Sequence, residues 1–420
     1  MTHGLWIVER DYMVSVLYQC MPVNLKDLTD EEFIKEVIKR IIPIESISPA
    51  SGGHGEKERV DELCKILEEL GYQNFKRYDV QDKWGATRSN VVLVVGDSNQ
   101  TFWIIPHTDT VPVGDPALWS KPPFKPTFEG DKIYGRGTSD DGQAIWLSLL
   151  ILKNLDASNL KYNLGFAFVA DEEVGSTYGI QHLLEKDLFK KNDLIIVPDA
   201  GTADGLQIEV AEKSILWIKF KVMGKQYHAS MPFMAVNANR EAMRFILKLD
   251  GALHKKFDAT NEIFSPPDST FEPTKHEKNV DNINTIPGTE IQYLDCRILP
   301  KYDLDMVIDF IDSQIREFQR ESKATITYEF MQKEQAPMPT RMDAPVVVEL
   351  KNAIKELRGA EPSAVGIGGG TCAAFFRRKG FDAVVWSTTV PEVAHQADEY
   401  VHVSHVLKDR DVIMKIVSKD

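Results

Sequence analysis

A histidine and an aspartate stand one residue apart at the end of an apolar run. The run over residues 101–106 reads Thr-Phe-Trp-Ile-Ile-Pro, and His107 and Asp109 follow it. A short continuous apolar run of this kind is typical of a buried strand. The strand would therefore present an imidazole and a carboxylate at its carboxyl end, and both groups can bind a metal ion or exchange a proton.

Other apolar runs in the chain end in the same kinds of side chain, and one acidic loop opens a predicted helix. Ligands of open α/β sheets gather at the carboxyl ends of the strands. We therefore expect these side chains to converge at one edge of a sheet, although they span positions 107 to 395. The further residues are Asp140, Asp141, Asp171, Glu172, Glu173, Asp199 and His395.

Imidazole and carboxylate donors without a thiolate suit catalytic zinc, cobalt or manganese. Two histidines and three carboxylates exceed the needs of one zinc ion and suit two metal ions about 3.5–4 Å apart, bridged by one carboxylate. Such a pair acidifies a bound water and polarises a carbonyl. A further carboxylate must then carry the proton of the water to the leaving nitrogen, and Glu172 stands beside a candidate ligand.

Each of these features alone is more often an ordinary surface turn or a solvated charge run. The prediction depends on five separate segments each supplying a ligand type. Two alternatives stay open, namely a mononuclear zinc hydrolase and an inactive homologue that serves as a binding module. The inactive homologue predicts the loss of a ligand or of the base, whereas all the candidate ligands and Glu172 are present.

The elements that would hold these residues alternate between strands and helices. A capping box of Thr29 and Glu32 begins the first helix. This alternation predicts an α/β fold, with a mixed, mostly parallel sheet flanked by helices. Strands are predicted over 90–95, 101–105, 163–170, 194–197 and 383–386, and helices over 29–41, 58–70, 143–155, 177–188 and 346–357.

The pattern changes near residue 208, where apolar and polar residues begin to alternate as in a half-exposed antiparallel strand. We predict an inserted α+β lid domain over residues 211–334, with an antiparallel sheet and two helices. The catalytic domain then comprises residues 1–210 and 335–420. The lid is predicted to contain helices over 237–249 and 303–319, strands over 289–298 and 324–330, and a polar, proline-rich stretch over 254–279.

The whole chain has 420 residues, of which 27% are charged, and a formal net charge of −14. This length predicts two domains. The negative charge argues against nucleic acid, whose phosphates need a basic face, and against an anionic membrane surface. No apolar run approaches the roughly 18 residues of a membrane span. Residues 4–20 are interrupted by charges and make a poor signal peptide, so we predict a cytoplasmic protein.

The four cysteines are far apart and form no CxxC pair, so neither a thiolate zinc site nor a disulfide framework is predicted. We expect reduced and mostly buried thiols. They are Cys20, Cys64, Cys296 and Cys372.

Together these residues resemble the dinuclear-zinc amidohydrolases and peptidases. That family includes succinyl-diaminopimelate desuccinylase, acetylornithine deacetylase, aminoacylase, glutamate carboxypeptidase and carnosine dipeptidase. The resemblance extends from about Asp27 to the end of the chain and implies a zinc-exopeptidase-like fold. Its motifs are Pro-His-Thr-Asp-Thr-Val-Pro, Tyr-Gly-Arg-Gly-Thr-Ser-Asp-Asp, Ala-Asp-Glu-Glu-Val-Gly-Ser, Val-Pro-Asp-Ala-Gly, Gly-Lys-Gln-Tyr-His-Ala-Ser-Met-Pro, Asn-Thr-Ile-Pro-Gly and Gly-Gly-Gly-Thr.

The resemblance implies a role for each matching residue. His107 and Asp199 would bind one zinc, Glu173 and His395 the other, and Asp140 would bridge both. Asp109 would hydrogen-bond the free nitrogen of His107, and Glu172 would be the general base and acid. The resemblance also implies a cis peptide bond at Asp140–Asp141. Many relatives have lysine where this chain has Asp141, which leaves open which aspartate bridges.

The resemblance further implies that His228 reaches from the lid into the site of a partner subunit and stabilises the oxyanion. The substrate carboxylate would be held by a set of lid and loop residues, although Arg297 could instead pair with Asp295 inside the lid. At position 372 a cysteine replaces the aspartate that is common in relatives. The implied carboxylate-binding residues are Asn284, Arg297, Gly369, Gly370 and Thr371.

These assignments predict a homodimeric enzyme with two divalent metal ions, most simply zinc, with cobalt or manganese as alternatives. A metal-bound hydroxide would cleave the amide bond of an N-acyl amino acid, as in desuccinylases and deacetylases. The short lid resembles that of the biosynthetic deacylases. Di- or carboxypeptidase action is the alternative, because specificity depends on lid and loop side chains that the common scaffold does not fix.

Overall fold

The computed structural model describes residues 23–419, so the predicted extension over residues 4–20, with Cys20, lies outside the described residues. Most of the chain is built on one mixed sheet of eight strands. They are β1 (Lys76–Gln81), β2 (Thr87–Val95), β3 (Thr101–Ile104), β6 (Asn163–Phe168), β7 (Leu194–Thr202), β8 (Gln207–Glu212), β15 (Ser363–Ile367) and β16 (Ala383–Thr388).

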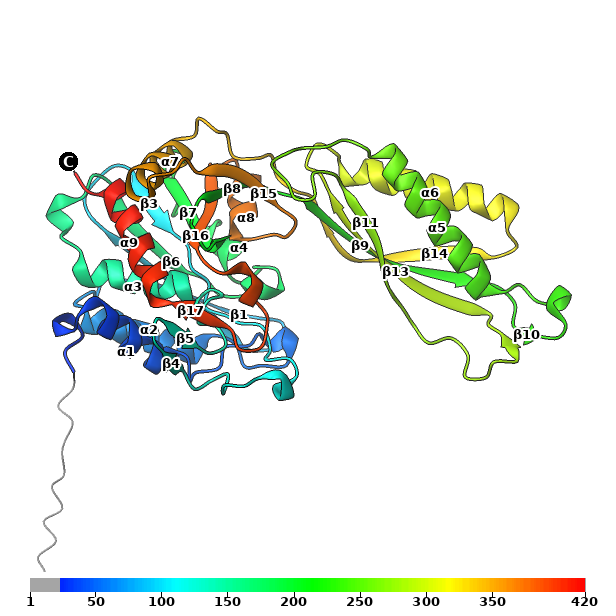
Figure 1. The fold of residues 1–420 in the computed structure, drawn as a ribbon, viewed down its shortest axis with the longest axis horizontal. Helices are drawn as coiled ribbons and strands as arrows, with labels where there is room; N and C mark the ends of the chain where they lie inside the picture. Colours follow the sequence, from blue (N-terminus) through cyan, green and yellow to red (C-terminus); the bar gives the residue numbers. More distant parts are fainter. Residues whose placement is uncertain (1–22, 420) are drawn as a thin grey trace, which may run out of the picture.

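The spatial order of the strands is β1-β2-β6-β3-β7-β16-β8-β15 (Figure 1). The central strands β6, β3, β7 and β16 run parallel to one another, and β15 runs parallel to β8. Antiparallel pairs join β1 to β2, β2 to β6 and β8 to β16. The prediction of a mixed, mostly parallel sheet is therefore confirmed.

Helices cover both faces of this sheet, so its strands can be apolar on both sides. In β3, Phe102 and Ile104 pack into the core of one face and Trp103 into the core of the other, as the two-residue period requires. One face carries α1 (Asp30–Ile41), α2 (Lys57–Glu69), α3 (Gly142–Asn154), α7 (Pro345–Arg358) and α9 (Val403–Val417), and the other carries α4 (Ile180–Leu183) and α8 (Cys372–Arg378).

Local sequence rules account for the first helix. Thr29 caps α1 by accepting a hydrogen bond from the Glu32 backbone, and the Glu32 side chain accepts one from the Thr29 backbone. Phe33, Val37 and Ile41 then recur on one buried face.

No helix within residues 23–419 is long and apolar enough to span a membrane. The three described cysteines, Cys64, Cys296 and Cys372, are free and buried.

A small sheet of three strands lies beside the larger one. It consists of β4 (Thr127–Glu129), β5 (Lys132–Tyr134) and β17 (Tyr400–His402), with β5 in the middle. β17 pairs with β5 and so joins the end of the chain to the loop that follows Tyr134. That loop carries Asp140.

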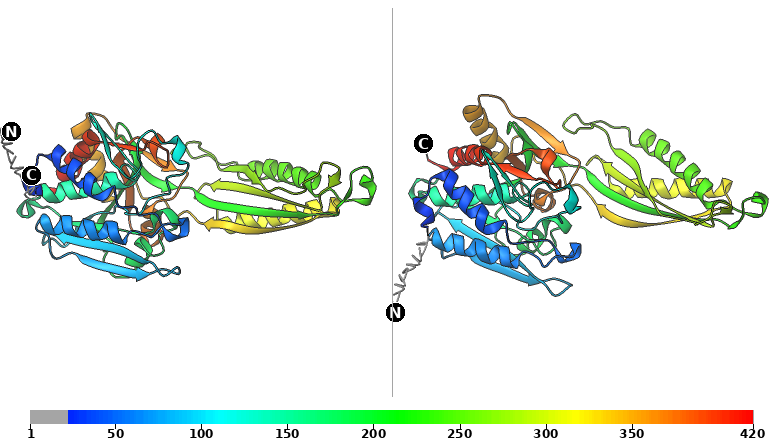
Figure 2. Two further views of the ribbon diagram at one scale, coloured as in Figure 1. Left: turned by 90° about the horizontal axis from the view of Figure 1, so that it is seen from below. Right: turned by 60° about the horizontal axis from the view of Figure 1, so that its bottom comes forward.

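The lid, which we define as residues 214–334, projects from the larger part as an elongated arm (Figures 1 and 2). Its main sheet is antiparallel, with the order β11-β13-β9-β14, and α5 and α6 pack against it around a separate core. A second, two-stranded sheet of β10 and β12 lies near the far end of the arm (Figure 1). The elements are β9 (Ser214–Met223), β10 (Tyr227–His228), α5 (Ala238–Lys256), β11 (Thr270–His276), β12 (Thr285–Ile286), β13 (Thr289–Ile298), α6 (Leu304–Glu321) and β14 (Thr325–Glu334).

Parts of the prediction differ from the structure, and the helix predicted over 237–249 continues to Lys256. The helix predicted over 177–188 is reduced to α4, because the turn that follows it is closed by hydrogen bonds to the third preceding residue. The proline-rich stretch contains β11, an edge strand that accommodates Pro273 beside a shift of register. β8 extends the main sheet to Glu212, beyond the expected domain boundary at residue 210.

Candidate metal centre

The carboxyl ends of the parallel strands bring the predicted ligands together. His107 follows β3 and forms an isolated bridge with Val169, directly after β6. Asp199 lies in the adjacent strand β7, and His395 lies on the loop that follows β16. Strands that run in the same direction end at the same edge of a sheet, which explains why residues distant in sequence meet here.

Asp140 lies between the two histidines. Its Oδ1 is 3.0 Å from His107 Nε2, and its Oδ2 is 3.1 Å from His395 Nε2. His107 Nε2 is also 3.6 Å from Asp199 Oδ1, and His395 Nε2 is 3.3 Å from Glu173 Oε2. The structure thus divides the five residues into two pairs that share the carboxylate of Asp140.

The unpaired oxygens of this cluster fit bound cations. Ligand atoms of His107, Asp140 and Glu173 lie within 4.8 Å of one another, and so do those of His107, Asp141 and Asp199. Among the described residues, Glu173 Oε1 and Asp141 Oδ1 are buried oxygens without a hydrogen-bond partner. Buried oxygens without a partner are costly unless a cation or a water satisfies them.

The geometry distinguishes the two adjacent aspartates. Asp140 faces both histidines, whereas Asp141 Oδ2 accepts a hydrogen bond of 3.0 Å from the His107 backbone. The peptide bond between them is cis, as the resemblance implied. Of the two, Asp140 therefore has the geometry of a bridging ligand.

Asp109 holds the loop that carries the acidic pair. Its carboxylate accepts hydrogen bonds from the backbone N–H groups of Glu172, at 3.0 Å, and Glu173, at 3.1 Å. His107 Nδ1 lies 3.0 Å from the Asp109 carbonyl oxygen and 3.5 Å from its carboxylate. The nearer partner of the imidazole is therefore the carbonyl, because the carboxylate is used by the two backbone N–H groups.

Glu399 was not found from the sequence, although it shapes the site. This fully buried carboxylate accepts hydrogen bonds from the backbone N–H groups of Gly137, Ser139 and Asp140, and from the Arg136 guanidinium at 2.6 Å. It therefore fixes the backbone that presents Asp140. The only sequence indication was an acidic residue before β17, which is indistinguishable from a surface charge.

The crowded carboxylates shift one another's protonation. Burial and the nearby charge of Asp199 raise the pKa of Glu172 well above its usual range. Burial and Asp140 raise the pKa of Glu173 to about 7. Contacts with Asp140 and Glu173 raise the pKa of His395 to about 10. Such a concentration of negative charge favours the binding of positive charge.

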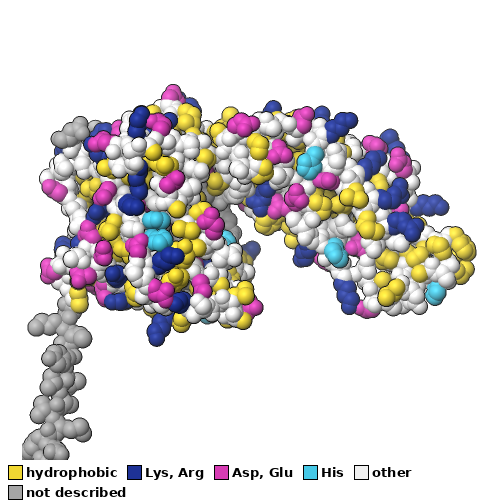
Figure 3. Space-filling model, viewed as in Figure 1, with side chains coloured by type: hydrophobic (Ala, Val, Ile, Leu, Met, Phe, Trp, Pro, Cys, Tyr) yellow, Lys and Arg dark blue, Asp and Glu magenta, His cyan; other side chains and the backbone are white. Residues whose placement is uncertain are grey.

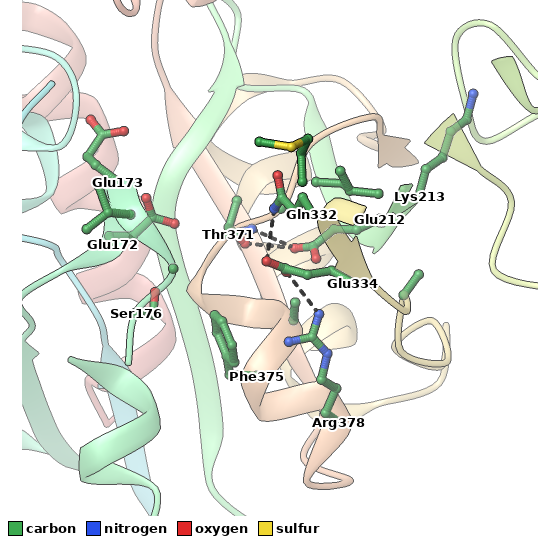
Figure 4. A pocket seen from close by; sticks show the side chains of 17 residues that line it. Glu172, Glu173, Ser176, Glu212, Lys213, Gln332, Glu334, Thr371, Phe375 and Arg378 are labelled. Atoms are coloured by element: carbon green, nitrogen blue, oxygen red, sulfur yellow. Dashed lines mark hydrogen bonds and ion pairs between the residues drawn. The ribbon is translucent and has the colours of Figure 1, made fainter. Parts of the chain in front are cut away.

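A cavity of about 440 Å³ adjoins the acidic pair (Figure 4). Glu172 and Glu173 line one part of it, and Gly370 and Thr371 line another. Gly369, predicted with them, does not line the cavity. Thr371 caps α8.

The predicted lid residues are not all near the metal cluster. His228 and Asn284 are exposed on β10 and just before β12, near the far end of the arm (Figure 1). Arg297 instead lies near the base of the lid. Its guanidinium binds both oxygens of Asp295, at 2.7 and 3.1 Å, and the Gly368 carbonyl at 2.8 Å. The alternative in which Arg297 pairs with Asp295 is the one that the structure contains.

The fold and the cluster define a metal-dependent hydrolase. The model of peptidase family M20/M25/M40 matches residues 103–419, and this chain belongs to that family. An uncharacterized metallohydrolase of Methanocaldococcus jannaschii is 42% identical over 410 residues, covering 92% of this chain and all of the relative.

A more distant relative and a solved structure extend the comparison. A succinyl-diaminopimelate desuccinylase of Orientia tsutsugamushi is 25% identical over 385 residues, covering 89% of this chain and 92% of that protein. The crystal structure of aminopeptidase PepT from Bacillus cereus superimposes with a TM-score of 0.71 at 20% identity, covering 92% of this chain and 98% of that one. This structural likeness confirms the predicted fold.

Proposed function

We propose that this protein hydrolyses the amide bond of an N-acyl amino acid at a centre of two divalent metal ions. The observation that carries the proposal is the carboxylate of Asp140, whose two oxygens face His107 and His395 separately. A relative named as a desuccinylase, at 25% identity, supports an acyl amino acid as the substrate. Di- or carboxypeptidase action is the second candidate, supported by the match to a peptidase family.

The metal ions would be held in two sets that share one ligand. His107 and Asp199 would hold one ion, Glu173 and His395 the other, and Asp140 both. Zinc suits these nitrogen and oxygen donors best, with cobalt and manganese as alternatives. When bound, such a pair acidifies a water and polarises the scissile carbonyl.

Glu172 is the proposed general base and acid. It lies beside the ligand Glu173 and lines the cavity, and Asp109 fixes the backbone of both. A carboxylate in this position can take a proton from the attacking water and pass it to the leaving nitrogen. Asp109 is thus a positioning residue.

His228 would serve the site of a second subunit. It lies near the end of the arm, where Figure 3 shows hydrophobic side chains gathered. Phe233 is 77% exposed there and Ile283 is fully exposed, so the tip has an apolar surface to bury. We propose a homodimer formed through the lid, in which His228 stabilises the oxyanion and Asn284 contacts the substrate.

The test combines a substrate screen with a base variant. Full-length protein loaded with zinc or cobalt is assayed for amine release from N-acyl amino acids and dipeptides, and its metal content is measured. Glu172→Gln should keep both metals and lose roughly 10²–10⁴-fold in kcat/KM. Glu173→Gln, the adjacent control, should lose metal. Unchanged turnover in Glu172→Gln would remove that residue from the mechanism.

A further inference from the structure

The cavity beside the metal cluster continues to a second carboxylate that the proposed mechanism does not use. It extends from Glu172 and Glu173 to Glu212, at the end of β8, and to Gln332 and Glu334 on the lid strand β14 (Figure 4). The main sheet and the lid therefore both contribute to it. The cavity therefore connects the acidic pair to Glu212.

Glu212 has one oxygen free. Glu212 is only 2% exposed. Oε1 accepts hydrogen bonds from the Thr371 backbone, at 3.2 Å, and from the Thr371 hydroxyl, at 2.8 Å. Oε2 has no hydrogen-bond partner among residues 23–419, and it lies on the side of Gly370, which also lines the cavity.

The neighbouring guanidinium does not neutralise Glu212. Arg377 Nη1 lies 3.5 Å from Glu212 Oε1, but both ends of this guanidinium bind the carboxylate of Glu209, at 2.9 and 3.0 Å. Its charge is therefore already compensated. Glu212 keeps an uncompensated acceptor in a nearly buried position.

The cationic side chains that line the cavity are also engaged elsewhere. Lys213 Nζ donates to the carbonyls of Pro266, at 2.9 Å, and Asp268, at 2.6 Å, and its side chain points away from Glu212 (Figure 4). Arg378 pairs with Glu334 at 3.4 Å. The cavity thus offers a bound group free acceptors and no free cation among its described lining residues.

We propose that this cavity binds an ammonium group of the substrate and that Glu212 is the residue that selects it. An ammonium donates charge-assisted hydrogen bonds, which a partly desolvated carboxylate accepts strongly. Burial raises the pKa of Glu212 to about 8 in the free cavity. A bound ammonium favours the ionised carboxylate, so Glu212 releases its proton as the ammonium binds. The inference rests on the proposed amide hydrolysis and narrows its substrate class. The ammonium can belong to a free amino terminus on the acyl side or to a basic side chain on the amine side.

Two matched substrate pairs separate these sources. Metal-loaded full-length protein is assayed with glycyl-leucine against acetyl-leucine, and with Nα-acetyl-lysine against Nα-acetyl-norleucine. We expect kcat/KM to be roughly 10–100-fold higher for the cationic member of at least one pair, the usual value of a hydrogen bond to a charged group. Glu212→Gln should bring that ratio close to one, because the amide keeps the bonds to Thr371 but loses the charge.

Glu329→Gln is the matched control. It removes one negative charge from the lid strand β14, where Glu329 pairs with Lys219 outside the cavity, and should leave the ratio unchanged. Calorimetry on both variants gives a readout that does not require turnover. It compares the binding of lysine with that of norleucine, and the binding of glycine with that of acetate. Thermal melting shows that each variant is folded.

The outcomes distinguish the inference from the function on which it rests. Amide hydrolysis without preference for either cationic substrate, or a preference that survives in Glu212→Gln, would overturn the ammonium site and leave the hydrolase standing. Unchanged turnover in Glu172→Gln would instead contradict the proposed role of Glu172 as general base, which is a separate claim from the ammonium site. Equal binding of the two ligands within each pair in calorimetry would also overturn the ammonium site.

Discussion

At the scale of single residues, the sequence indicated which candidate ligands would lie together, but it did not indicate the residues that support them. His107 and Asp199 follow apolar runs that end in metal-binding side chains, so residue type and position both indicate them. Glu399 acts by binding backbone N–H groups, and Glu212 lies in the wall of a cavity. Neither role leaves a pattern in the sequence. Their functions depend on which segments meet in the fold.

Glu212 also predicts a pH dependence of stability. Burial, with the nearby charge of Glu209, raises its pKa from 4.5 to about 8. Between these values the folded state holds a proton that the unfolded state has released, so the contribution of Glu212 to stability falls as pH rises. Relative to the wild type, Glu212→Gln should therefore gain about 1–3 kcal/mol of unfolding free energy between pH 5 and 8.

Denaturant unfolding at the two pH values, without metal, measures this difference. Glu329→Gln should show a constant offset from the wild type, because that side chain is on the exposed lid sheet. An equally constant offset for Glu212→Gln would show that its carboxyl group titrates normally.

At the scale of elements, several buried strands and the capped first helix were predictable, whereas the edge strand β11 and the extent of the helix over 177–188 were not. The predicted strand over 289–298 is β13 in full, and the capping box at Thr29 begins α1. β11 was missed because Pro273 and exposed polar residues resemble a loop, which an edge strand tolerates. The helix over 177–188 failed because its apolar residues cover a short turn rather than a long helical face.

Because the candidate ligands lie at the ends of several strands, we expect bound metal ions to stabilise the fold. Removal of the metals leaves the carboxylates of Asp140, Glu173 and Asp199 with only His107 and His395, among the described residues, to compensate their charge. Chelation should lower the unfolding free energy by about 3 kcal/mol for metal initially at 100 times its Kd. Differential scanning calorimetry with and without chelator measures the shift. Asp140→Asn, without the shared ligand, should respond much less, and an equal response would exclude Asp140 as a ligand.

At the scale of the whole molecule, the arm separates His228 from the metal cluster of its own chain. His228 lies near the end of the lid, whereas His107 and Glu172 lie at the edge of the main sheet (Figure 1). The resemblance implied that His228 acts in the site of a partner subunit, and this separation is what that prediction requires. The apolar tip around Phe233 gives a physical reason for a second subunit to cover it.

Subunit mixing tests whether His228 works in trans. Glu172→Gln and His228→Ala should each be nearly inactive alone, since each lacks a group that acts in the transition state. In a mixed dimer, however, one site combines the Glu172 of one chain with the His228 of the other. An equal mixture should therefore recover about a quarter of the wild-type activity, because half of the dimers are mixed and each has one intact site.

Activity is measured after co-refolding or co-expression, with size-exclusion chromatography to establish the dimer. No recovery in a verified mixed dimer would show that His228 does not complete the site of its partner.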